Sequence, residues 1–460
     1  DFDLLVIGSG PAGEKGAAQA AYFDKRVAVI EKAAEPGGAG VHTGTLPSKT
    51  LREAALFLSG YRQRELYGVS VSVDPVLAVP KLLSRKNTVR GQEVERVRWN
   101  LGRHKVTYVH GSARLVDAHT VEVSSEREAP RRMSAEFILL APGSVPHHPD
   151  HIPFSDPDVD DSDTILRIDR MPSRLLVVGG GVIGCEYASM FAALGVKVTL
   201  VEPRTELLAF LDADMSAALG RAFVAAGMDL RLGACVKSVR RYGEHLEVTL
   251  ESGDTVACDK LLYAAGRSGA TAGLGLEEVG VELGKRGVVV VDEAFRTRVP
   301  SIYAAGDVIG FPALASTSMD QARVAVCHAF GFGYKRQVSA LLPYGIYTIP
   351  EISCVGWSEE DARAAGMDVV CGSALYRHNA RAKILGDPDG LVKLVFERAT
   401  RKLVGAHVLG DRATELVHIG QAVIALGGTV DTLIEMVFNY PTLAECFKYA
   451  AYDALGRFAR

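Results

Sequence analysis

The chain contains two copies of a glycine-rich fingerprint, and this duplication constrains its fold more than any other feature. The first copy is Gly8-Ser-Gly-Pro-Ala-Gly13, which follows the apolar run Asp1–Ile7 and precedes an alanine-rich helical pattern that ends at about Tyr22. A second apolar run, Arg26–Ile30, then ends at Glu31. The order of strand, glycine turn, helix, strand and acid is typical of a dinucleotide-binding βαβ unit.

Each of the three glycines of this unit, and the acid at its end, has a defined structural role. Gly8 permits the tight turn, Gly10 lets the backbone approach a pyrophosphate, and Gly13 allows the helix to pack closely on the strand. The N-terminus of the helix supplies N–H groups and a positive dipole end to the phosphates. Glu31 can accept hydrogen bonds from ribose hydroxyls.

The same pattern recurs in the middle of the chain. The apolar run Leu175–Val178 leads into Gly179-Gly-Gly-Val-Ile-Gly184, and a further apolar run, Val196–Val201, ends at Glu202. Positions 8, 10, 13 and 31 become 179, 181, 184 and 202, an offset of 171 in each case. One such fingerprint is a weak signal, because glycine turns are common in α/β proteins, but two copies with equal spacing are a strong one. The sequence therefore predicts two bound dinucleotides, a flavin and a nicotinamide.

Three further apolar runs end in glycine turns. Phe137–Gly143 and Leu261–Arg267 each close one nucleotide-binding unit, and Ile302–Asp307 ends in an acid. An aspartate at the carboxyl end of a strand suits a ligand contact at the switch point of an α/β sheet. The alternative for Asp307 is an ordinary turn aspartate.

The pattern changes from about Pro343, where no glycine fingerprint follows. Strands are predicted over 346–355, 391–396 and 403–408, and helices over 414–425 and 443–455. This region is therefore expected to be a third, α+β domain. The predicted fold class is α/β, with two Rossmann-like dinucleotide-binding domains and a C-terminal α+β domain.

The overall charge argues against nucleic-acid or membrane binding. The 460 residues contain 51 Lys and Arg against 55 Asp and Glu, a formal net charge of −4. The charged stretch Lys81–Lys105 is predicted to be an amphipathic helix with a solvated charged face. No segment reaches the roughly 20 apolar residues that a bilayer requires, and the start of the chain shows no signal-peptide pattern.

The cysteines exclude two further classes of protein. There are seven, an odd number at wide spacings, and this fits neither a disulfide scaffold nor a zinc ribbon. We expect no metal site and a reducing, cytoplasmic location. Cys185 and Cys327 lie in apolar helical runs and are predicted to be core residues.

These features resemble the flavoprotein disulfide reductases. Gly37–Lys49 is similar to their redox-active loop, Ile302–Asp307 to their flavin-binding strand and Phe438–Glu445 to their catalytic C-terminal loop. Within this superfamily the chain is most similar to the soluble pyridine nucleotide transhydrogenases. The segments that carry this closer resemblance are 42–49, 161–165, 184–189, 207–211, 306–310, 345–353, 418–422 and 438–442.

The chain departs from the superfamily where its disulfide chemistry lies. The redox loop normally carries two cysteines five positions apart, and here those positions are Gly40 and Thr45. The transhydrogenases share the threonine but retain the first cysteine. The C-terminal loop normally places a histidine before the proline, where this chain has Tyr440, while Glu445, the usual partner of that histidine, remains. Disulfide reduction is therefore not expected.

The resemblance implies a domain order and a cofactor set. It places the first part of an FAD-binding domain at 1–147, an NAD(P)-binding domain at 148–269, the second part of the FAD domain at 270–338 and a dimerisation domain at 339–460. It implies bound FAD, NAD and NADP as nucleotides, a homodimer through the C-terminal domain, and a cis peptide bond before Pro441.

The resemblance also assigns the site residues. Lys49 would lie beside flavin N5 and pair with Glu186, and Thr45 would pack on the flavin face. Glu202 suits the free 2′-hydroxyl of NAD, while Arg204 either binds the 2′-phosphate of NADP or is a solvated turn residue. FAD would be held by Gly8, Gly10, Gly13, Glu31 and Asp307, and the nicotinamide nucleotide by Gly179, Gly181, Gly184, Glu202 and Arg204.

Without a redox disulfide the flavin is the only electron store that the sequence offers. The activity implied is NAD(P) transhydrogenation, in which one site takes the two nucleotides in turn by a ping-pong route. The alternative is an NAD(P)H dehydrogenase or oxidase that passes electrons to a quinone, a dye or oxygen. A flavoprotein kept only for binding or sensing is a third hypothesis, and intact Lys49, Glu186 and both fingerprints argue against it.

Overall fold

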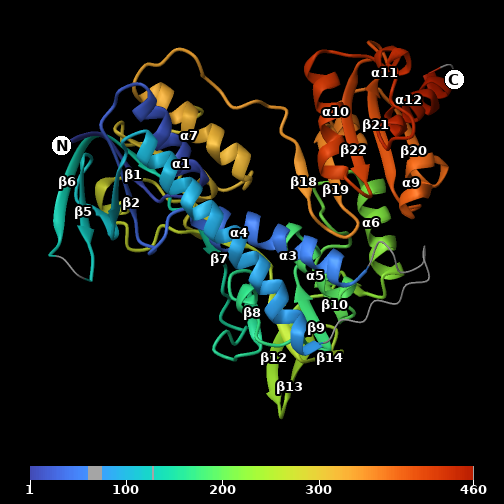
Figure 1. Cartoon of the computed structure of the whole chain (residues 1–460), viewed down its shortest axis with the longest axis horizontal. Coiled ribbons are helices and arrows are strands. Elements are labelled where there is room, and N and C mark those ends of the chain that lie inside the picture. The colour runs from blue at the N-terminus through green and yellow to red at the C-terminus, as the bar shows by residue number, and fades with distance from the viewer. Residues whose placement is uncertain (61–74, 127–128, 459–460) are drawn as a thin grey trace. The chain divides into compact units, whose positions relative to one another are not determined.

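The computed structural model describes residues 1–60, 75–126 and 129–458 (Figure 1). These residues divide into two compact units. The first comprises 1–50, 83–147 and 266–339, and the second comprises 51–82, 148–265 and 340–460. Each unit is built from three stretches of sequence, and the chain passes from one unit to the other after residues 50, 82, 147, 265 and 339.

The first unit is organised around a sheet in the order β3-β2-β1-β6-β5-β4, with β17 also paired to β6. In β1, Leu4 and Val6 pack on the face covered by α1 and α7, while Leu5 and Ile7 pack on the opposite face. Burial of both faces explains why Leu4–Ile7 form an uninterrupted apolar run. The strands are β1 Phe2–Ile7, β2 Val27–Glu31, β3 Thr107–His110, β4 Ser112–Leu115, β5 Thr120–Ser124, β6 Arg131–Leu140 and β17 Ile302–Ala304.

Helices cover one face of this sheet. They are α1 Pro11–Tyr22, α7 Ala315–Ala329 and the later part of α4 Pro75–Arg103. Val94, Val97 and Leu101 of α4 are buried and most of its charged residues are exposed, which confirms the predicted amphipathic helix. A short helix, α2 Gly38–His42, and a longer one, α3 Thr45–Leu58, follow β2. Strand β7 Ser144–Pro146 pairs with β16 Arg267–Gly269.

The second unit contains a parallel sheet in the order β11-β10-β9-β15-β8. Its strands are β8 Val159–Asp161, β9 Arg174–Val178, β10 Lys197–Glu202, β11 Asp229–Leu232 and β15 Lys260–Tyr263. The crossover helices are α5 Val182–Ala193 and α6 Ala213–Ala225. An antiparallel sheet of β12 Val236–Tyr242, β13 His245–Leu250 and β14 Thr255–Cys258 follows β11.

The C-terminal part of this unit has an antiparallel sheet in the order β18-β19-β22-β21-β20. Its core contains Val355, Leu394, Phe396, Val408 and Phe447. The strands are β18 Tyr344–Ile346, β19 Ile352–Gly356, β20 Val369–Leu375, β21 Leu391–Glu397 and β22 Leu403–Leu409. The helices are α8 Glu359–Ala364, α9 Ala380–Leu385, α10 Ala413–Ala425, α11 Val430–Glu435 and α12 Glu445–Phe458.

One predicted strand is wrong. The segment 346–355 is not a single strand, because β18 ends at Ile346 and β19 begins at Ile352. Pro350 has no N–H to offer a neighbouring strand. The N–H groups of Tyr347 and Ile349 donate instead to side chains of α5, those of Glu186 and Ser189. The five residues 347–351 therefore form a turn.

All seven cysteines are free thiols. Cys185 and Cys327 are buried in helices, as predicted. Burial raises the pKa of the thiols of Cys258, Cys354, Cys371 and Cys446 to about 12. Among the helices that the structure describes, none has the length and apolar character to cross a membrane.

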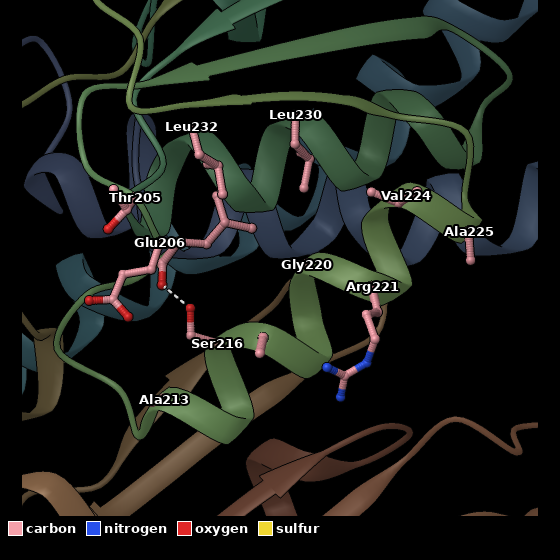
Figure 2. A pocket seen from close by; sticks show the side chains of 12 residues that line it. Thr205, Glu206, Ala213, Ser216, Gly220, Arg221, Val224, Ala225, Leu230 and Leu232 are labelled. Carbon is pink, nitrogen blue, oxygen red and sulfur yellow. Dashed lines mark hydrogen bonds between the residues drawn. The ribbon is translucent and has the colours of Figure 1, made fainter.

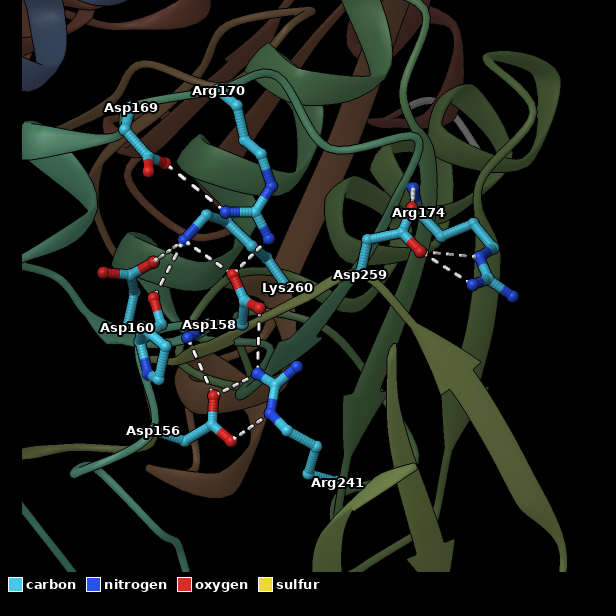
Figure 3. A network of polar contacts seen from close by, with 10 residues as sticks. Asp156, Asp158, Asp160, Asp169, Arg170, Arg174, Arg241, Asp259 and Lys260 are labelled. Carbon is cyan, nitrogen blue, oxygen red and sulfur yellow. Dashed lines mark hydrogen bonds and ion pairs between the residues drawn. The ribbon is translucent and has the colours of Figure 1, made fainter. Parts of the chain in front are cut away.

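A network of buried charges ties the segment before β8 to the rest of its sheet (Figure 3). The ammonium of Lys260 lies 3.2 Å from Asp160, 3.4 Å from Asp158 and 3.2 Å from the carbonyl of Pro157. Arg241 of β12 bridges Asp156 and Asp158. Burial raises the pKa of Asp158, but hydrogen bonds from arginines outweigh it, so the pKa lies below its ordinary value.

A second buried pair joins the two parts of the second unit. Asp212 is fully buried and caps α6 by accepting from the N–H of Asp214. The ammonium of Lys393 on β21 lies 2.9 Å from Asp212 and 2.8 Å from Glu359 at the start of α8. Burial raises the pKa of Glu359, but hydrogen bonds from Lys393, Arg363 and Cys371 together with the charge of Lys393 outweigh it and bring the pKa to about 2.

Replacing Lys393 with Met should destabilise the protein by about 3–5 kcal/mol, because it leaves the buried Asp212 carboxylate without its cation. Urea unfolding at pH 7 measures this loss. Glu359 has a lowered pKa in the folded state, so its stabilising effect is present above pH 4.5 and is lost as the pH falls toward 2. In the K393M variant, the free energy of unfolding should no longer include this loss between pH 4.5 and pH 2.

The matched control is Arg398→Met. Arg398 pairs with Asp368 on the surface of the same domain, with side chains 42% and 72% exposed. Its loss should change the stability by at most about 1 kcal/mol. An equal effect of both substitutions would contradict the role assigned to the buried pair.

Candidate functional site

The first glycine loop connects β1 to α1 and is shaped by two backbone contacts. Gly8 has a φ of +99°, and a Cβ on it would lie 2.3 Å from the carbonyl oxygen of Ala141. A Cβ on Gly13 would lie 1.9 Å from the carbonyl oxygen of Gly8. The loop can therefore form only with glycine at both positions, and the start of α1 is held against the end of β1.

The second glycine loop repeats this geometry between β9 and α5. Gly179 has a φ of +111°, and its Cβ would lie 2.8 Å from the carbonyl oxygen of Ala264. A Cβ on Gly184 would lie 1.8 Å from the carbonyl oxygen of Gly179. The two loops therefore share their local conformation as well as their spacing in sequence.

The packing of the protein does not require glycine at the middle position of either loop. A Cβ on Gly181 meets no described atom within 4 Å, and one on Gly10 has a single neighbour, the Cα of Gly38 at an ordinary 3.7 Å. Their φ angles, −81° and −66°, suit any residue. A glycine that the fold does not require fits a position where a ligand approaches the backbone closely.

The helix starts at these loops also fit an anion. Neither α1 nor α5 has a side chain that caps its N-terminal N–H groups. By contrast, α6 and α8 are capped by Asp212 and Ser358. Uncapped N–H groups and the positive end of the helix dipole are the elements of a phosphate site. Both loops thus fit the pyrophosphate of a dinucleotide.

The two acids at the strand ends are buried and hold their loops. Glu31 accepts from the N–H and the hydroxyl of Ser9, at 2.9 and 2.7 Å, and from the N–H of Ala33. Glu202 accepts from the N–H of Gly180 and, at 2.9 Å, from that of Arg204. Each carboxylate has lone pairs beyond these bonds, so ribose hydroxyls can still be accepted.

Asp307 follows β17 and begins a single 3-10 turn, Asp307–Ile309. Its Oδ2 accepts from the hydroxyl of Ser144 at 3.0 Å, and that hydroxyl accepts from Arg267 at 2.7 Å. Gly306, with a φ of +85°, donates its N–H to the side chain of Gln321. Asp307 is thus fixed at the carboxyl end of its strand, as a ligand-contacting residue would be.

Thr45 and Lys49 lie on the first turns of α3. Thr45 begins the helix and is exposed, while Lys49 is partly buried and donates to Ser48 at 3.4 Å. Gly40 lies in α2, and a Cβ on it would lie 2.9 Å from the ring of Pro11. The position of the missing first cysteine is therefore closely packed by the first glycine loop.

Glu186 lies in the other unit, on α5, and is 4% exposed. Its Oε1 accepts from the N–H of Tyr347 at 3.0 Å. The predicted pairing of Lys49 with Glu186 stays a prediction.

Arg204 follows the second acid and is exposed. No carboxylate among the described residues forms an ion pair with its guanidinium. The residues that follow Arg204 in sequence line a groove of about 640 Å³, which lies between α6, β11 and the loop 205–207 (Figure 2). Apolar side chains such as Leu230, Leu232 and Val224 line most of this groove. None of the predicted cofactor residues is among the lining residues.

The C-terminal loop places Tyr440 at the surface, 70% exposed. The peptide bond between Tyr440 and Pro441 is cis, as predicted. Glu445 begins α12 and accepts from the N–H of Thr442 at 3.4 Å. Glu445 thus supports the local turn, with a tyrosine in place of the histidine that it orients in the superfamily. Within the described part of the chain, no group of three or more His, Cys, Asp or Glu residues is arranged to hold a metal ion.

Three residues of these loops were missed by sequence reasoning. Ser9 donates to Glu31 and accepts from the N–H of Gly37, so it links both sides of the first loop. Ser144 and Arg267 hold Asp307. The position of Ser9 inside the fingerprint was a usable signal, but the partners of Ser144 lie 123 and 163 residues away, and no local pattern indicates them.

Comparison with known proteins agrees with this geometry. Residues 2–329 match the family model of the pyridine nucleotide-disulphide oxidoreductases, and residues 342–451 match the dimerisation domain of the same family. Among curated proteins, the soluble pyridine nucleotide transhydrogenase of Mycobacterium tuberculosis is 44% identical over 458 residues, which cover 99% of this chain and 98% of the relative. That of Pseudomonas putida is 40% identical over 460 residues, with 99% of both chains covered.

Solved structures share the whole fold. LpdA from Mycobacterium tuberculosis superposes with a TM-score of 0.89 at 30% identity, covering 98% of this chain and 99% of that one. The Cu(II) complex of the HOCl-induced flavoprotein disulfide reductase RclA from Escherichia coli gives a TM-score of 0.89 at 28% identity, with 98% and 99% coverage.

Replacing Gly181 with Ala should separate ligand binding from folding. The new Cβ meets no described atom, so the thermal midpoint should stay within about 2 °C of the wild type, while the affinity for a nicotinamide nucleotide falls by about 10-fold or more. Gly184→Ala is the control, because its Cβ would lie 1.8 Å from a carbonyl oxygen and should lower the thermal midpoint by about 5 °C or more. Calorimetry measures both, and unchanged affinity in G181A would contradict the site.

Proposed function

Since the chain belongs to the pyridine nucleotide-disulphide oxidoreductase family, we propose that it is an FAD-dependent NAD(P) transhydrogenase, which moves reducing equivalents from NADPH to NAD. Membership in this family implies the use of a flavin and a pyridine nucleotide. The observation that carries the proposal is that both glycine loops are intact while none of the seven cysteines occupies position 40 or 45. The chain thus has a loop for each of two dinucleotides, but no pair of cysteines in the segment that follows the first loop.

FAD is held by the first loop. Gly8, Gly10 and Gly13 would present the start of α1 to its pyrophosphate, Glu31 would bind the adenosine ribose, and Asp307 would contact the ribityl chain. When bound, FAD supplies the chemistry, since it takes a hydride from one nicotinamide nucleotide and returns it to another. The uncapped start of α1 supports this assignment.

The nicotinamide nucleotide is held by the second loop, through Gly179, Gly181 and Gly184. Glu202 accepts from the 2′-hydroxyl of NAD. Arg204 would give the 2′-phosphate of NADP a charge-assisted bond, and the exposure of this arginine, two residues after Glu202, supports the assignment. A site that carries both groups can take NADPH and NAD in turn.

Lys49 and Glu186 set the charge beside the reacting part of the flavin. The lysine ammonium favours negative charge that develops on the reduced ring, and the carboxylate keeps the ammonium in place. Thr45 would pack on the flavin face and take no proton. Burial of Glu186 to 4% exposure supports a carboxylate that requires an opposite charge close by.

Disulfide chemistry is absent from this route. Neither Gly40 nor Thr45 can carry an electron pair, and the packing of the Pro11 ring against Gly40 leaves little room for a thiol there. The electrons therefore pass between nucleotides without a protein carrier. This feature distinguishes the chain from the reductases that its family is named for.

The match of residues 342–451 to the dimerisation domain supports a homodimer, with the exposed Tyr440 loop near the partner. The nicotinamide nucleotides are its small-molecule partners. Seven free thiols, five of them buried, suit a reducing, cytoplasmic setting.

Stopped-flow spectroscopy of the holoenzyme tests the function. The flavin is first reduced with one equivalent of NADPH and then mixed with thio-NAD. We expect flavin absorbance to return together with the absorbance of reduced thio-NAD, because the second nucleotide enters the site that the first has left. Reoxidation by a quinone but not by thio-NAD would contradict transhydrogenation and favour an NAD(P)H dehydrogenase.

Replacing Arg204 with Ala tests the coenzyme assignment. The loss of a charge-assisted bond to the 2′-phosphate should weaken NADPH by about 10- to 100-fold, while NADH, which lacks this phosphate, changes by less than about twofold. The reductive half-reaction measures both dissociation constants. Arg221→Ala, an exposed arginine of α6, is the matched control and should change neither. Equal weakening of both nucleotides in R204A would remove its phosphate role.

A further inference from the structure

The turn 347–351 is bonded to two helices through three backbone polar groups, two N–H groups and one carbonyl. The N–H of Tyr347 donates to the carboxylate of Glu186 at 3.0 Å, and the N–H of Ile349 donates to the hydroxyl of Ser189 at 3.0 Å. Between them, the carbonyl of Thr348 accepts from Nε of Arg52 at 3.1 Å. The turn therefore connects α5, which carries Glu186, to α3, which carries Arg52.

Ser189 is also hydrogen-bonded to Glu186, one helical turn earlier on α5. Its hydroxyl accepts from Ile349 and donates to the carbonyl of Glu186 at 3.0 Å. Both the side chain and the backbone of Glu186 are thus bonded, directly or through Ser189, to the 347–351 turn. The orientation of this carboxylate follows the position of the turn.

Arg52 holds the turn in place. Its side chain is only 4% exposed, and its Nη2 lies 3.0 Å from Oε1 of Glu351, the last residue of the turn. Its Nη1 lies 2.6 Å from Glu53, which is 63% exposed. Arg52 therefore contacts the turn at two places, the Thr348 carbonyl and the Glu351 carboxylate.

Glu351 is buried and bonded through both oxygens. Oε2 accepts from the hydroxyl of Thr414 at 2.9 Å and from its N–H at 3.2 Å, at the start of α10. A buried ion pair gives little net stability, because desolvation of both charges offsets their attraction. Its geometry, by contrast, is strongly determined, since every bond has a fixed direction. Such a pair suits positioning better than it suits stabilisation.

We propose that Arg52 and Glu351 are positioning residues for Glu186, acting through the 347–351 turn. This inference rests on the proposed function, in which Glu186 holds the charge of the lysine beside the flavin. Arg52 also lies one helical turn after Lys49 on α3. The pair thus determines where the turn presents its N–H groups to Glu186.

The first test is Arg52→Lys in the FAD-bound protein. Lysine keeps the charge but cannot bond Thr348 and Glu351 in the fixed geometry of a guanidinium. At saturating NADPH the rate of flavin reduction should fall about 10-fold, and the dissociation constant of NADPH should change by less than about twofold.

A double-mutant cycle tests whether Glu351 acts through Arg52. Glu351→Gln should slow flavin reduction, and the double variant R52K/E351Q should be no slower than R52K alone. Arg401→Lys is the control, because Arg401 forms a comparable two-bond pair with Asp431 on the surface of the same domain. It should change neither the rate of flavin reduction nor the dissociation constant of NADPH.

Two outcomes would overturn the inference. One is a wild-type rate of flavin reduction in R52K. The other applies if R52K does not fold, in which case R52M/E351M replaces the pair by apolar residues of similar volume and is expected to fold. A wild-type reduction rate in that variant would show that the pair does not position Glu186.

These outcomes are distinct from failure of the proposed function. The inference is measured on flavin reduction alone, whereas transhydrogenation is decided by reoxidation of the wild type with thio-NAD. A slow R52K variant together with no reoxidation by thio-NAD would keep the positioning role and reject only the acceptor.

Discussion

The contact on which both nucleotide-binding units depend is the approach of a helix start to the end of the preceding strand. A Cβ on Gly13 or Gly184 would lie within 2 Å of the carbonyl oxygen of the first glycine of its loop. Only glycine permits this approach, and it brings the N–H groups of α1 and α5 to the carboxyl edge of their sheets. The two buried acids, Glu31 and Glu202, then bond the same loops from the neighbouring strand. The site geometry is thus set by backbone contacts, and side chains reinforce it.

The chain keeps this scaffold while lacking the thiols of its family. Cysteine is absent at 40 and 45, and the Pro11 ring packs where the side chain of residue 40 would lie. The remaining cysteines have raised pKa values wherever burial dominates, so they are poor nucleophiles. A flavoprotein built in this way can exchange electrons only with ligands that reach its flavin. This restriction is the physical basis of the transhydrogenase proposal.

Two groups of buried charges lie where parts of the second unit meet. Lys393 joins α6 and α8 through Asp212 and Glu359, and Arg52 joins α3 to the 347–351 turn through Glu351. Desolvation makes such pairs costly to bury, and it also makes them sensitive to the directions of their hydrogen bonds. Charged pairs in these places favour one arrangement of helices against the C-terminal sheet. The geometry around Glu186 therefore depends on residues far from it in sequence.

The sequence by itself determined the two βαβ units, because each follows from apolar runs and glycines within about 30 residues, where the backbone has few alternatives. It also determined that Cys185 and Cys327 are core residues. It did not predict that 346–355 breaks into two strands, nor that Ser144 and Arg267 hold Asp307. The N–H groups of Tyr347 and Ile349 find their acceptors 161 and 160 residues away, and the Thr348 carbonyl finds Arg52 at a separation of 296. Only the tertiary structure decides such contacts, since a run of strand-forming residues carries no record of the distant side chains that compete for its hydrogen bonds.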